Sequence, residues 1–339
     1  MSAVACAADA DLVAVVAAEL GCAEAPVEVR TDGVRRLVGA WRPAELPAAG
    51  SGVFGAPGAH IITGGTGGIG LHLTERLASR GADIVLASRN QPSAEVVERV
   101  ARLAGTGARI LHVAADVTRR EDVAALVQAA REHSGRVAGV LHAAGVLRDG
   151  FVLRKNPDDA DAVIAPKMLG VRWLDEETRG EHLEYFAAFS STAAALSSVG
   201  QSDYSYANAY LDHFVLGRER LRARGERFGV SLSVNWPLWR DGGMAMDVGA
   251  QQAMRRELGF GALGTGVALD GLERALGVLL LGCCWLLGML VSFNGRWRLS
   301  IWRRRGLLRL VLFGVLPRWG VPGFGRWLRS SCVSCLPVS

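Results

Sequence analysis

The chain has 339 residues, and half of them are hydrophobic, which is enough for a core in one large domain or two smaller ones. Its net charge of +5 is unevenly spread, because residues 274–339 hold ten arginines and no lysine, aspartate or glutamate. Residues 1–273 carry 28 basic and 33 acidic side chains. The basic balance belongs to the tail alone, which argues against a nucleic-acid partner for the main part of the chain.

The six cysteines lie near the two ends, and residues 23–282 contain none. This distribution argues against a disulfide framework and favours a reducing compartment, so we expect a cytoplasmic protein. Cys332 and Cys335 form a single Cys-x-x-Cys pair without a second pair or a nearby histidine, and we expect no metal site there. The N-terminus lacks the basic start and apolar core of a signal peptide.

The first 58 residues predict a small appendage and a linker. An apolar helix is expected over 8–20, and Val27–Arg30 and Arg35–Trp41 predict a hairpin. Pro43 to Gly58 is rich in Pro, Gly and Ala, which is typical of a linker.

From His60 onward, strands and helices alternate. Strands are predicted at 60–63, 83–88, 109–113, 137–142, 184–191 and 230–235, with helices ending at 80 and spanning 93–103, 118–132, 157–177 and 202–224. Thr118 and Glu121 predict a capping box at the start of one helix. The alternation predicts an α/β fold with a doubly wound parallel sheet.

A glycine-rich turn, GGTGGIG, joins the first of these strands to its helix. Backbone N–H groups at a helix N-terminus face an anion, and missing side chains allow its close approach, so the turn favours a dinucleotide pyrophosphate. A tight structural turn is the alternative. The candidate cofactor-binding residues here are Thr63, Gly64, Thr66, Gly67, Gly68, Ile69 and Gly70.

Three later segments extend this candidate cofactor site. An arginine after the second strand suits a ribose 2′-phosphate, so Ser88 and Arg89 favour NADPH over NADH, against the alternative of a solvated surface arginine. The strand 109–113 is followed by Asp116 and Val117, which are in a position to contact an adenine ring. The strand 137–142 is followed by the small residues Ala143, Ala144 and Gly145, which allow the backbone to approach a nicotinamide ribose.

Two hydroxyl groups in residues 189–208 can share one substrate oxygen. Ser191 follows an apolar strand, Tyr204 lies thirteen positions later, and Asn208 follows Tyr204 by about one helical turn. The phenol can protonate an alkoxide while the serine holds the oxygen, provided that a nearby cation lowers the pKa of the tyrosine. A buried tyrosine and a capping serine are the alternative.

With these residues in view, the chain resembles the ketoreductase domains of modular type I polyketide synthases, a branch of the short-chain dehydrogenase/reductase superfamily with a Rossmann-like fold. The resemblance covers about residues 25–273. It rests on ITGGTGGIG (62–70), HAAGVL (142–147), Lys167, FSS (189–191), GQSDYSYAN (200–208) and NWPLW (235–239).

The resemblance implies roles for these residues. Tyr204 would be the proton donor and Ser191, rather than Ser190, would hold the ketone oxygen. Lys167 would lower the pKa of the tyrosine and touch the cofactor ribose, and Asn208 would complete the polar network. The implied reaction is hydride transfer from NADPH to the β-carbonyl of an acyl chain held as a thioester on the phosphopantetheine of an acyl carrier protein, beside other polyketide synthase domains.

The resemblance also implies a stereochemical outcome. Asp149 matches the family's marker for a D-configured hydroxyl product, and Leu196 stands where the opposite type has tryptophan. Gln201 lies in the tyrosine motif. Pro237 and Trp239 lie in a segment similar to that of synthases that borrow their acyltransferase, and Gly242 and Gly243 give it the freedom of either a substrate lid or a surface loop.

Three segments follow from this comparison: a remnant of a structural subdomain with its linker at 1–58, a catalytic domain at 59–273 and a basic apolar tail at 274–339. Residues 275–295 carry no charge and are long enough to span a bilayer, with arginines after them. Out-of-frame translation of a GC-rich gene is the favoured alternative, and it predicts an irregular or helical tail that lacks the final strand. An inactive scaffold domain and a free-standing reductase of small ketones are the competing functions.

Overall fold

The computed structural model describes residues 3–5, 12–20, 28–31, 36–38, 52–105, 107–196, 199–243, 249, 261–280, 289–290, 301–304 and 307–310. The chain divides into two compact units, 1–41 with 316–339 and 42–315. Cys332 and Cys335 lie outside the described residues.

The first unit contains a short helix and a small sheet. Helix α1 spans Leu12–Leu20, and the sheet has the order β1-β2-β3, with β1 at Ala3–Ala5, β2 at Glu28–Thr31 and β3 at Arg36–Val38. Strands β2 and β3 are antiparallel, which confirms the predicted hairpin. Strand β1, which pairs with β2 in parallel, was not predicted.

The second unit is built on a seven-stranded sheet with the order β10-β9-β8-β7-β4-β5-β6, and all of its pairings are parallel. The chain starts at β4 in the interior and builds outward first to one side and then to the other, which confirms the doubly wound arrangement. The strands are β4 (Ala59–Thr63), β5 (Asp83–Ser88), β6 (Ile110–Ala114), β7 (Val137–His142), β8 (Tyr185–Ser191), β9 (Val230–Trp236) and β10 (Met289–Leu290).

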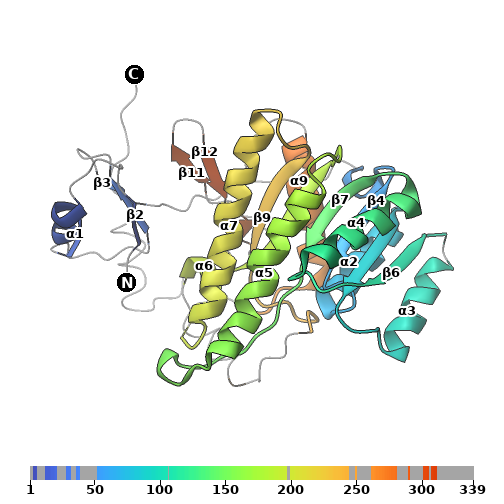
Figure 1. The fold of residues 1–339 in the computed structure, drawn as a ribbon, viewed down its shortest axis with the longest axis horizontal. Coiled ribbons are helices and arrows are strands. Elements are labelled where there is room, and N and C mark those ends of the chain that lie inside the picture. The colour runs from blue at the N-terminus through green and yellow to red at the C-terminus, as the bar shows by residue number, and fades with distance from the viewer. Residues whose placement is uncertain are drawn as a thin grey trace. The chain divides into compact units, whose positions relative to one another are not determined.

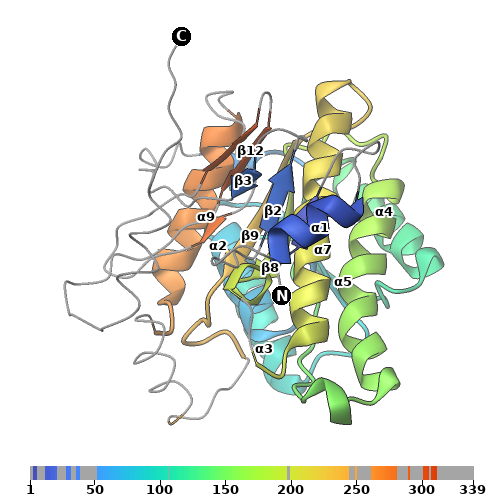
Figure 2. The same cartoon turned by 90° about the vertical axis from the view of Figure 1, so that its left-hand side faces the viewer.

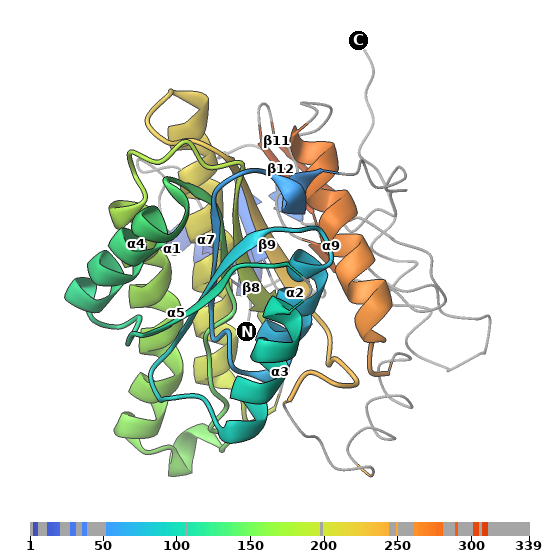
Figure 3. The ribbon, with the colours of Figure 1, turned by 90° about the vertical axis from the view of Figure 1, so that its right-hand side faces the viewer.

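Helices cover both faces of this sheet. Helices α4, α5 and α7 lie on one face and α2, α3 and α9 on the other (Figures 1 and 3), and β9 lies between α7 and α9 (Figure 2). The bounds are α2 (Gly68–Ala78), α3 (Ala94–Ala104), α4 (Arg120–Ser134), α5 (Pro157–Glu177), α6 (Ala193–Leu196), α7 (Ser202–Ala223) and α9 (Thr265–Leu280), with short 3-10 turns η1 (Val53–Gly55) and η2 (Val152–Arg154).

Two local predictions are wrong. The end of the expected linker belongs to the core, because Phe54 is fully buried and its ring packs edge-on against Tyr185 at 5.8 Å. The capping box at Thr118 does not form, because Arg119 is the N-cap residue of α4 and the Thr118 hydroxyl donates to the Asp116 carboxylate instead. A short Asp side chain competes with the helix for nearby donors in this way.

The tail contains strands that the sequence did not predict. Strand β10 pairs with β9 at the sheet edge, and β11 (Ile301–Arg304) pairs with β12 (Leu307–Leu310) as an antiparallel hairpin. No helix in the described ranges is both long enough and apolar enough to cross a bilayer. Within the uncharged run 275–295, residues 281–288 and 291–295 lie outside these ranges.

Two histidines are buried as neutral rings in the sheet, and they make stability depend on pH. His60 contacts the Tyr185 hydroxyl at 2.7 Å and the Ala56 carbonyl oxygen at 3.1 Å, and burial lowers its pKa to about 4. Burial lowers the pKa of His142 to about 3, and the positive charge of Lys167 acts in the same direction.

We expect the free energy of unfolding to fall as the pH drops from about 6.5 to about 5, because the unfolded chain binds protons on both histidines before the folded chain does. Urea titrations across this interval measure the change as a shift in the unfolding midpoint. The variant His60→Gln, which cannot titrate, is expected to show a weaker dependence. A midpoint that stays constant over the interval contradicts the assignment.

Candidate functional site

The candidate site lies at the carboxyl ends of β4, β7 and β8, where the strand order reverses. This is the crevice in which open α/β sheets bind ligands. The glycine turn follows β4, residues 143–145 follow β7, and Ser191 ends β8. Tyr204 lies in the first turn of α7. The parallel register therefore brings together segments that are far apart in the sequence.

The glycine turn packs so closely against the segment after β7 that side chains are excluded. Gly64 has a φ of +67°, and a Cβ there would lie 3.0 Å from the Ala144 Cα. A Cβ at Gly70 would lie 2.3 Å from the Gly64 carbonyl oxygen. Gly67 is the N-cap residue of α2 and has no side chain to cap the helix, so the first N–H groups of the helix remain available to an anion. This cradle fits a dinucleotide pyrophosphate.

Thr63 has a structural role in this cradle. It is fully buried, its hydroxyl lies 2.8 Å from His142 Nδ1, and the Ala144 backbone N–H donates to it at 3.3 Å. These contacts join the end of β4 to the end of β7. Thr63 therefore stabilises the turn through His142 and the Ala144 backbone, and its hydroxyl is engaged in these contacts.

The ribose end of the crevice includes a residue that the sequence analysis missed. The Ser88 hydroxyl donates to the Asn90 carbonyl oxygen at 2.8 Å and lies 2.8 Å from His112 Nε2. Because that hydroxyl has one proton, His112 must be the donor in the second contact. Arg89 is exposed beside this pair. His112 could have been found only from the pairing of β5 with β6, which the sequence did not specify.

The residues expected near an adenine ring have other contacts. Asp116 accepts hydrogen bonds from both the backbone N–H and the hydroxyl of Thr118. Val117 is a buried member of the core cluster. Asp116 Oδ1 and the buried Val117 side chain therefore hold the loop after β6 in place, and the contact of this loop with an adenine ring stays a prediction.

Lys167 is buried on α5 and is directed to the end of β8. Its Nζ donates to the Phe189 carbonyl oxygen at 2.9 Å and lies 5.7 Å from the centroid of the Tyr204 ring. A Cβ at Gly145 would lie 3.0 Å from the Lys167 Cε, so this glycine makes room for the lysine chain. Burial lowers the pKa of Lys167 to about 8, and Asp212 opposes that change.

In this arrangement the net effect on the pKa of Tyr204 is upward, and the lowering of that pKa by Lys167 stays a prediction. Burial raises the pKa of Tyr204, while hydrogen bonds to Ser191 and Asn208 act in the opposite direction. The Asp149 charge raises it further. The phenol is therefore protonated at neutral pH and can act as a proton donor.

The two serines after Phe189 have different contacts. The Ser190 hydroxyl donates to the Asn208 carbonyl oxygen at 3.1 Å and accepts from the Asn235 side chain at 3.0 Å. The Ser191 hydroxyl accepts from the Ala193 backbone N–H at 3.2 Å and hydrogen-bonds with Tyr204. Ser190 is therefore part of a structural network, and Ser191 remains the serine that faces the tyrosine.

Asn208 is fully buried one turn after Tyr204. Its Nδ2 donates to the Tyr204 carbonyl oxygen at 2.8 Å, and among the described residues its Oδ1 has no hydrogen-bond partner. An acceptor of this kind inside a protein usually meets a water molecule or a ligand.

The residues expected to contact substrate or set stereochemistry lie partly at the surface and partly in the core. The Gln201 side chain donates to Asp149 Oδ2 at 2.9 Å at the surface, and we call these two residues the Asp149 wall. Trp239 is buried edge-on against Trp236 at 4.9 Å, and Pro237 is also buried, so their contact with substrate stays a prediction. Leu196 ends α6, and its side chain lies outside the described residues.

The glycines after Trp239 pack against the cradle. A Cβ at Gly68 would lie 2.6 Å from the Gly242 carbonyl carbon, and Gly243 has a φ of +80°. His72 Nε2 contacts the Asp241 carbonyl oxygen at 3.1 Å. The described part of the expected lid therefore packs on the start of α2, and 244–248 and 250–260 lie outside the described residues.

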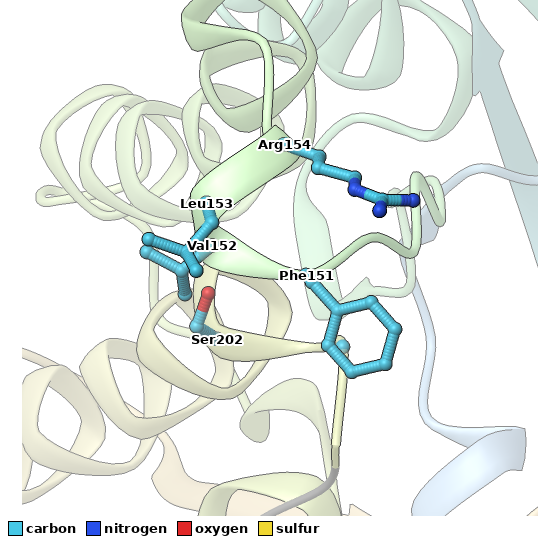
Figure 4. A pocket seen from close by; sticks show the side chains of 6 residues that line it. Phe151, Val152, Leu153, Arg154 and Ser202 are labelled. Atoms are coloured by element: carbon cyan, nitrogen blue, oxygen red, sulfur yellow. The ribbon is translucent and has the colours of Figure 1, made fainter.

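A cavity of about 590 Å³ lies between the η2 segment and the start of α7 (Figure 4). Its edge carries exposed apolar side chains, among them Leu153 at 99% exposure. The residues lining the cavity are Phe151, Val152, Leu153, Arg154, Gly200 and Ser202.

Comparisons with known proteins give one consistent result. The family model for the KR domain matches residues 58–241. Polyketide synthase PksN of Bacillus subtilis is 34% identical over 71% of this chain, and polyketide synthase ThaG of Burkholderia thailandensis is 37% identical over 65%. The chain spans only 4% of the length of either relative.

Solved structures agree. A ketoreductase domain from the bacillaene assembly line matches 74% of this chain and 60% of that chain, with 30% identity and a TM-score of 0.69. A structure described as A-type ketoreductases from a modular polyketide synthase matches 81% of this chain and 58% of that chain, with 31% identity and a TM-score of 0.70. From its fold, its site and these similarities, the chain belongs to the family of polyketide synthase ketoreductase domains.

Proposed function

We propose that this chain reduces the β-keto group of an acyl thioester to a β-hydroxy group, with NADPH as the hydride donor. The observation that supports this most directly is the grouping of a serine, a tyrosine and a lysine beside the glycine cradle. Ser191 hydrogen-bonds with Tyr204, and the Lys167 amine lies over the face of the same ring.

Each polar group has a distinct part in the proposed reaction. Bound NADPH supplies the hydride. Ser191 holds the ketone oxygen by hydrogen bonding, and Tyr204 transfers its phenolic proton to that oxygen as negative charge develops there. Because the pKa of Lys167 is about 8, the amine is charged at neutral pH and stabilises the phenolate left by the transfer.

Residues at the ends of β4 and β5 would hold the cofactor. The backbone of Gly64 to Gly70 would receive the pyrophosphate, and the exposed Arg89 guanidinium suits a ribose 2′-phosphate. The contacts of the Ser88 hydroxyl with the Asn90 carbonyl oxygen and with His112 hold the turn that carries Arg89. These features support NADPH rather than NADH.

The proposed substrate carrier is an acyl carrier protein, whose phosphopantetheine arm would bring the thioester to the Asp149 wall. Two observations support this. PksN and ThaG are polyketide synthases, and the chain matches only 4% of each, as expected for one domain among several. Asp149, held by Gln201, supports a D-configured product.

Reduction of a β-ketoacyl N-acetylcysteamine thioester, a small pantetheine surrogate, tests the proposal. With NADPH we expect one β-hydroxy product, mainly of D configuration, and with NADH a rate lower by about 10-fold or more, because the 2′-phosphate contact is missing. Product is measured by chiral chromatography. Equal rates with both cofactors contradict the role of Arg89, and an L-configured product contradicts the role of Asp149.

A further inference from the structure

A buried ion pair includes Asp203, the residue that precedes Tyr204 on α7. Lys155 Nζ is 2.7 Å from Asp203 Oδ2, and the two side chains are only 11% and 5% exposed. Asp203 precedes Tyr204 in the first turn of α7, whereas Lys155 follows η2 on the segment that carries Asp149. The pair therefore joins the two segments that form the substrate wall.

Three further contacts involve the same segments, one within residues 148–155 and two between the segments. The Lys155 amine also donates to the Arg148 carbonyl oxygen. The Gly150 backbone N–H donates to the Gly200 carbonyl oxygen at 2.9 Å, and Gln201 donates to Asp149 at 2.9 Å. Lys155 is the only charged side chain among these donors. It folds residues 148–155 back on themselves while attaching them to α7.

The burial of this pair distinguishes it from ordinary surface ion pairs. Exposed pairs contribute little to stability, and two charges taken out of water are costly unless their geometry is favourable. Arg148, which precedes η2, and Asp159, which follows it on α5, form such an exposed pair at 3.7 Å, with both side chains at least half exposed. The buried pair fixes one arrangement of the wall in a way that the exposed pair does not.

We propose that Lys155 is a positioning residue that holds the Asp149 segment against the start of α7 and thereby fixes which face of the ketone meets the hydride. The inference rests on the proposed reductase function. Lys155 acts through Asp203 and the Arg148 carbonyl, and it does not touch the reacting atoms. We call the Lys155–Asp203 pair, together with the contact of Lys155 to the Arg148 carbonyl, the clip. Without the clip, the wall formed by Asp149 and Gln201 can shift relative to Tyr204, and both orientations of the thioester become productive.

The test is the enantiomer ratio of the product. In Lys155→Met the stem remains and the charge is lost, so we expect the minor enantiomer to increase about 10-fold and kcat/KM to fall about 10-fold or more. The affinity for NADPH, measured by fluorescence titration, is expected to stay within about 2-fold, because the clip is remote from the glycine cradle. Lys155→Arg is expected to restore most of the parent ratio.

Two controls separate positioning from stability. Arg148→Gln, which removes the exposed pair, is expected to keep the parent ratio. The double variant Lys155→Met/Asp203→Leu leaves no buried charge unpaired, so it is expected to fold while the minor enantiomer still increases. Variants that are less stable but keep the parent enantiomer ratio overturn the inference. If the parent itself forms no product, the proposed function fails, and faster amide hydrogen exchange over 148–155 in Lys155→Met still tests the clip.

Discussion

Replacing Tyr204 with phenylalanine is expected to lower kcat for reduction of a β-ketoacyl thioester by about 10²- to 10⁴-fold, the usual contribution of a positioned general acid. The substitution removes one oxygen from a ring that is otherwise held by α7 and lies near Lys167. The affinity for NADPH is expected to change little, because the phenol is not part of the glycine cradle. Initial rates of NADPH oxidation and a fluorescence titration measure the two quantities.

Tyr206 provides the matched control for this prediction. It lies on the same helix two positions later and is 58% exposed, so Tyr206→Phe removes the same atom from a surface site. We expect the rate of this variant to equal that of the parent. Equal rates for the parent and Tyr204→Phe would remove Tyr204 from its proposed role.

Asp175→Ala is expected to lower the free energy of unfolding by about 3–5 kcal/mol, the cost of leaving buried positive charge without its partner. Arg218 Nε donates to Asp175 Oδ1 at 2.8 Å, and Arg227 donates to Oδ1 at 2.9 Å and to Oδ2 at 3.0 Å. Burial lowers the pKa of Arg218 to about 10, so it stays charged at neutral pH. Urea unfolding at neutral pH measures the loss.

The next residue on α5 provides the control. Glu176 accepts from Arg172 at 3.1 Å at the surface, where both side chains are about a third exposed or more. Glu176→Gln is therefore expected to cost less than about 1 kcal/mol. Comparable losses for the two variants would show that burial does not set the strength of the Asp175 cluster.

The sequence predicted best those elements whose pattern is local. The bounds of β5 and β7 agree with the structure to the residue, because apolar runs ended by polar or glycine residues define a buried strand, and α5 lies in the stretch in which a long helical segment was expected. The glycine turn and the Ser191–Tyr204 spacing likewise depend on neighbouring residues. Together they locate the crevice before any coordinates are known.

What the sequence could not predict depends on partners far away in the chain. Trp239 was predicted to contact substrate, and the sequence did not indicate that its ring packs edge-on against Trp236. Thr118 matches a capping box, but Asp116 takes its donor groups. The Lys155–Asp203 pair and the Asp175 cluster join segments with no shared pattern, so only the packing of α5, α7 and the η2 segment brings them together.

In the proposed reaction, hydride passes from a nicotinamide to the β-carbon of an acyl thioester at the site that contains Tyr204. The most direct measurement uses NADPH deuterated at both C4 positions with a β-ketoacyl pantetheine thioester, followed by mass spectrometry of the product. We predict one deuterium per product molecule, bonded to the carbon that carries the new hydroxyl group. A β-hydroxy product without deuterium, or NADPH oxidation without a reduced thioester, would show that hydride does not pass from NADPH to the β-carbon.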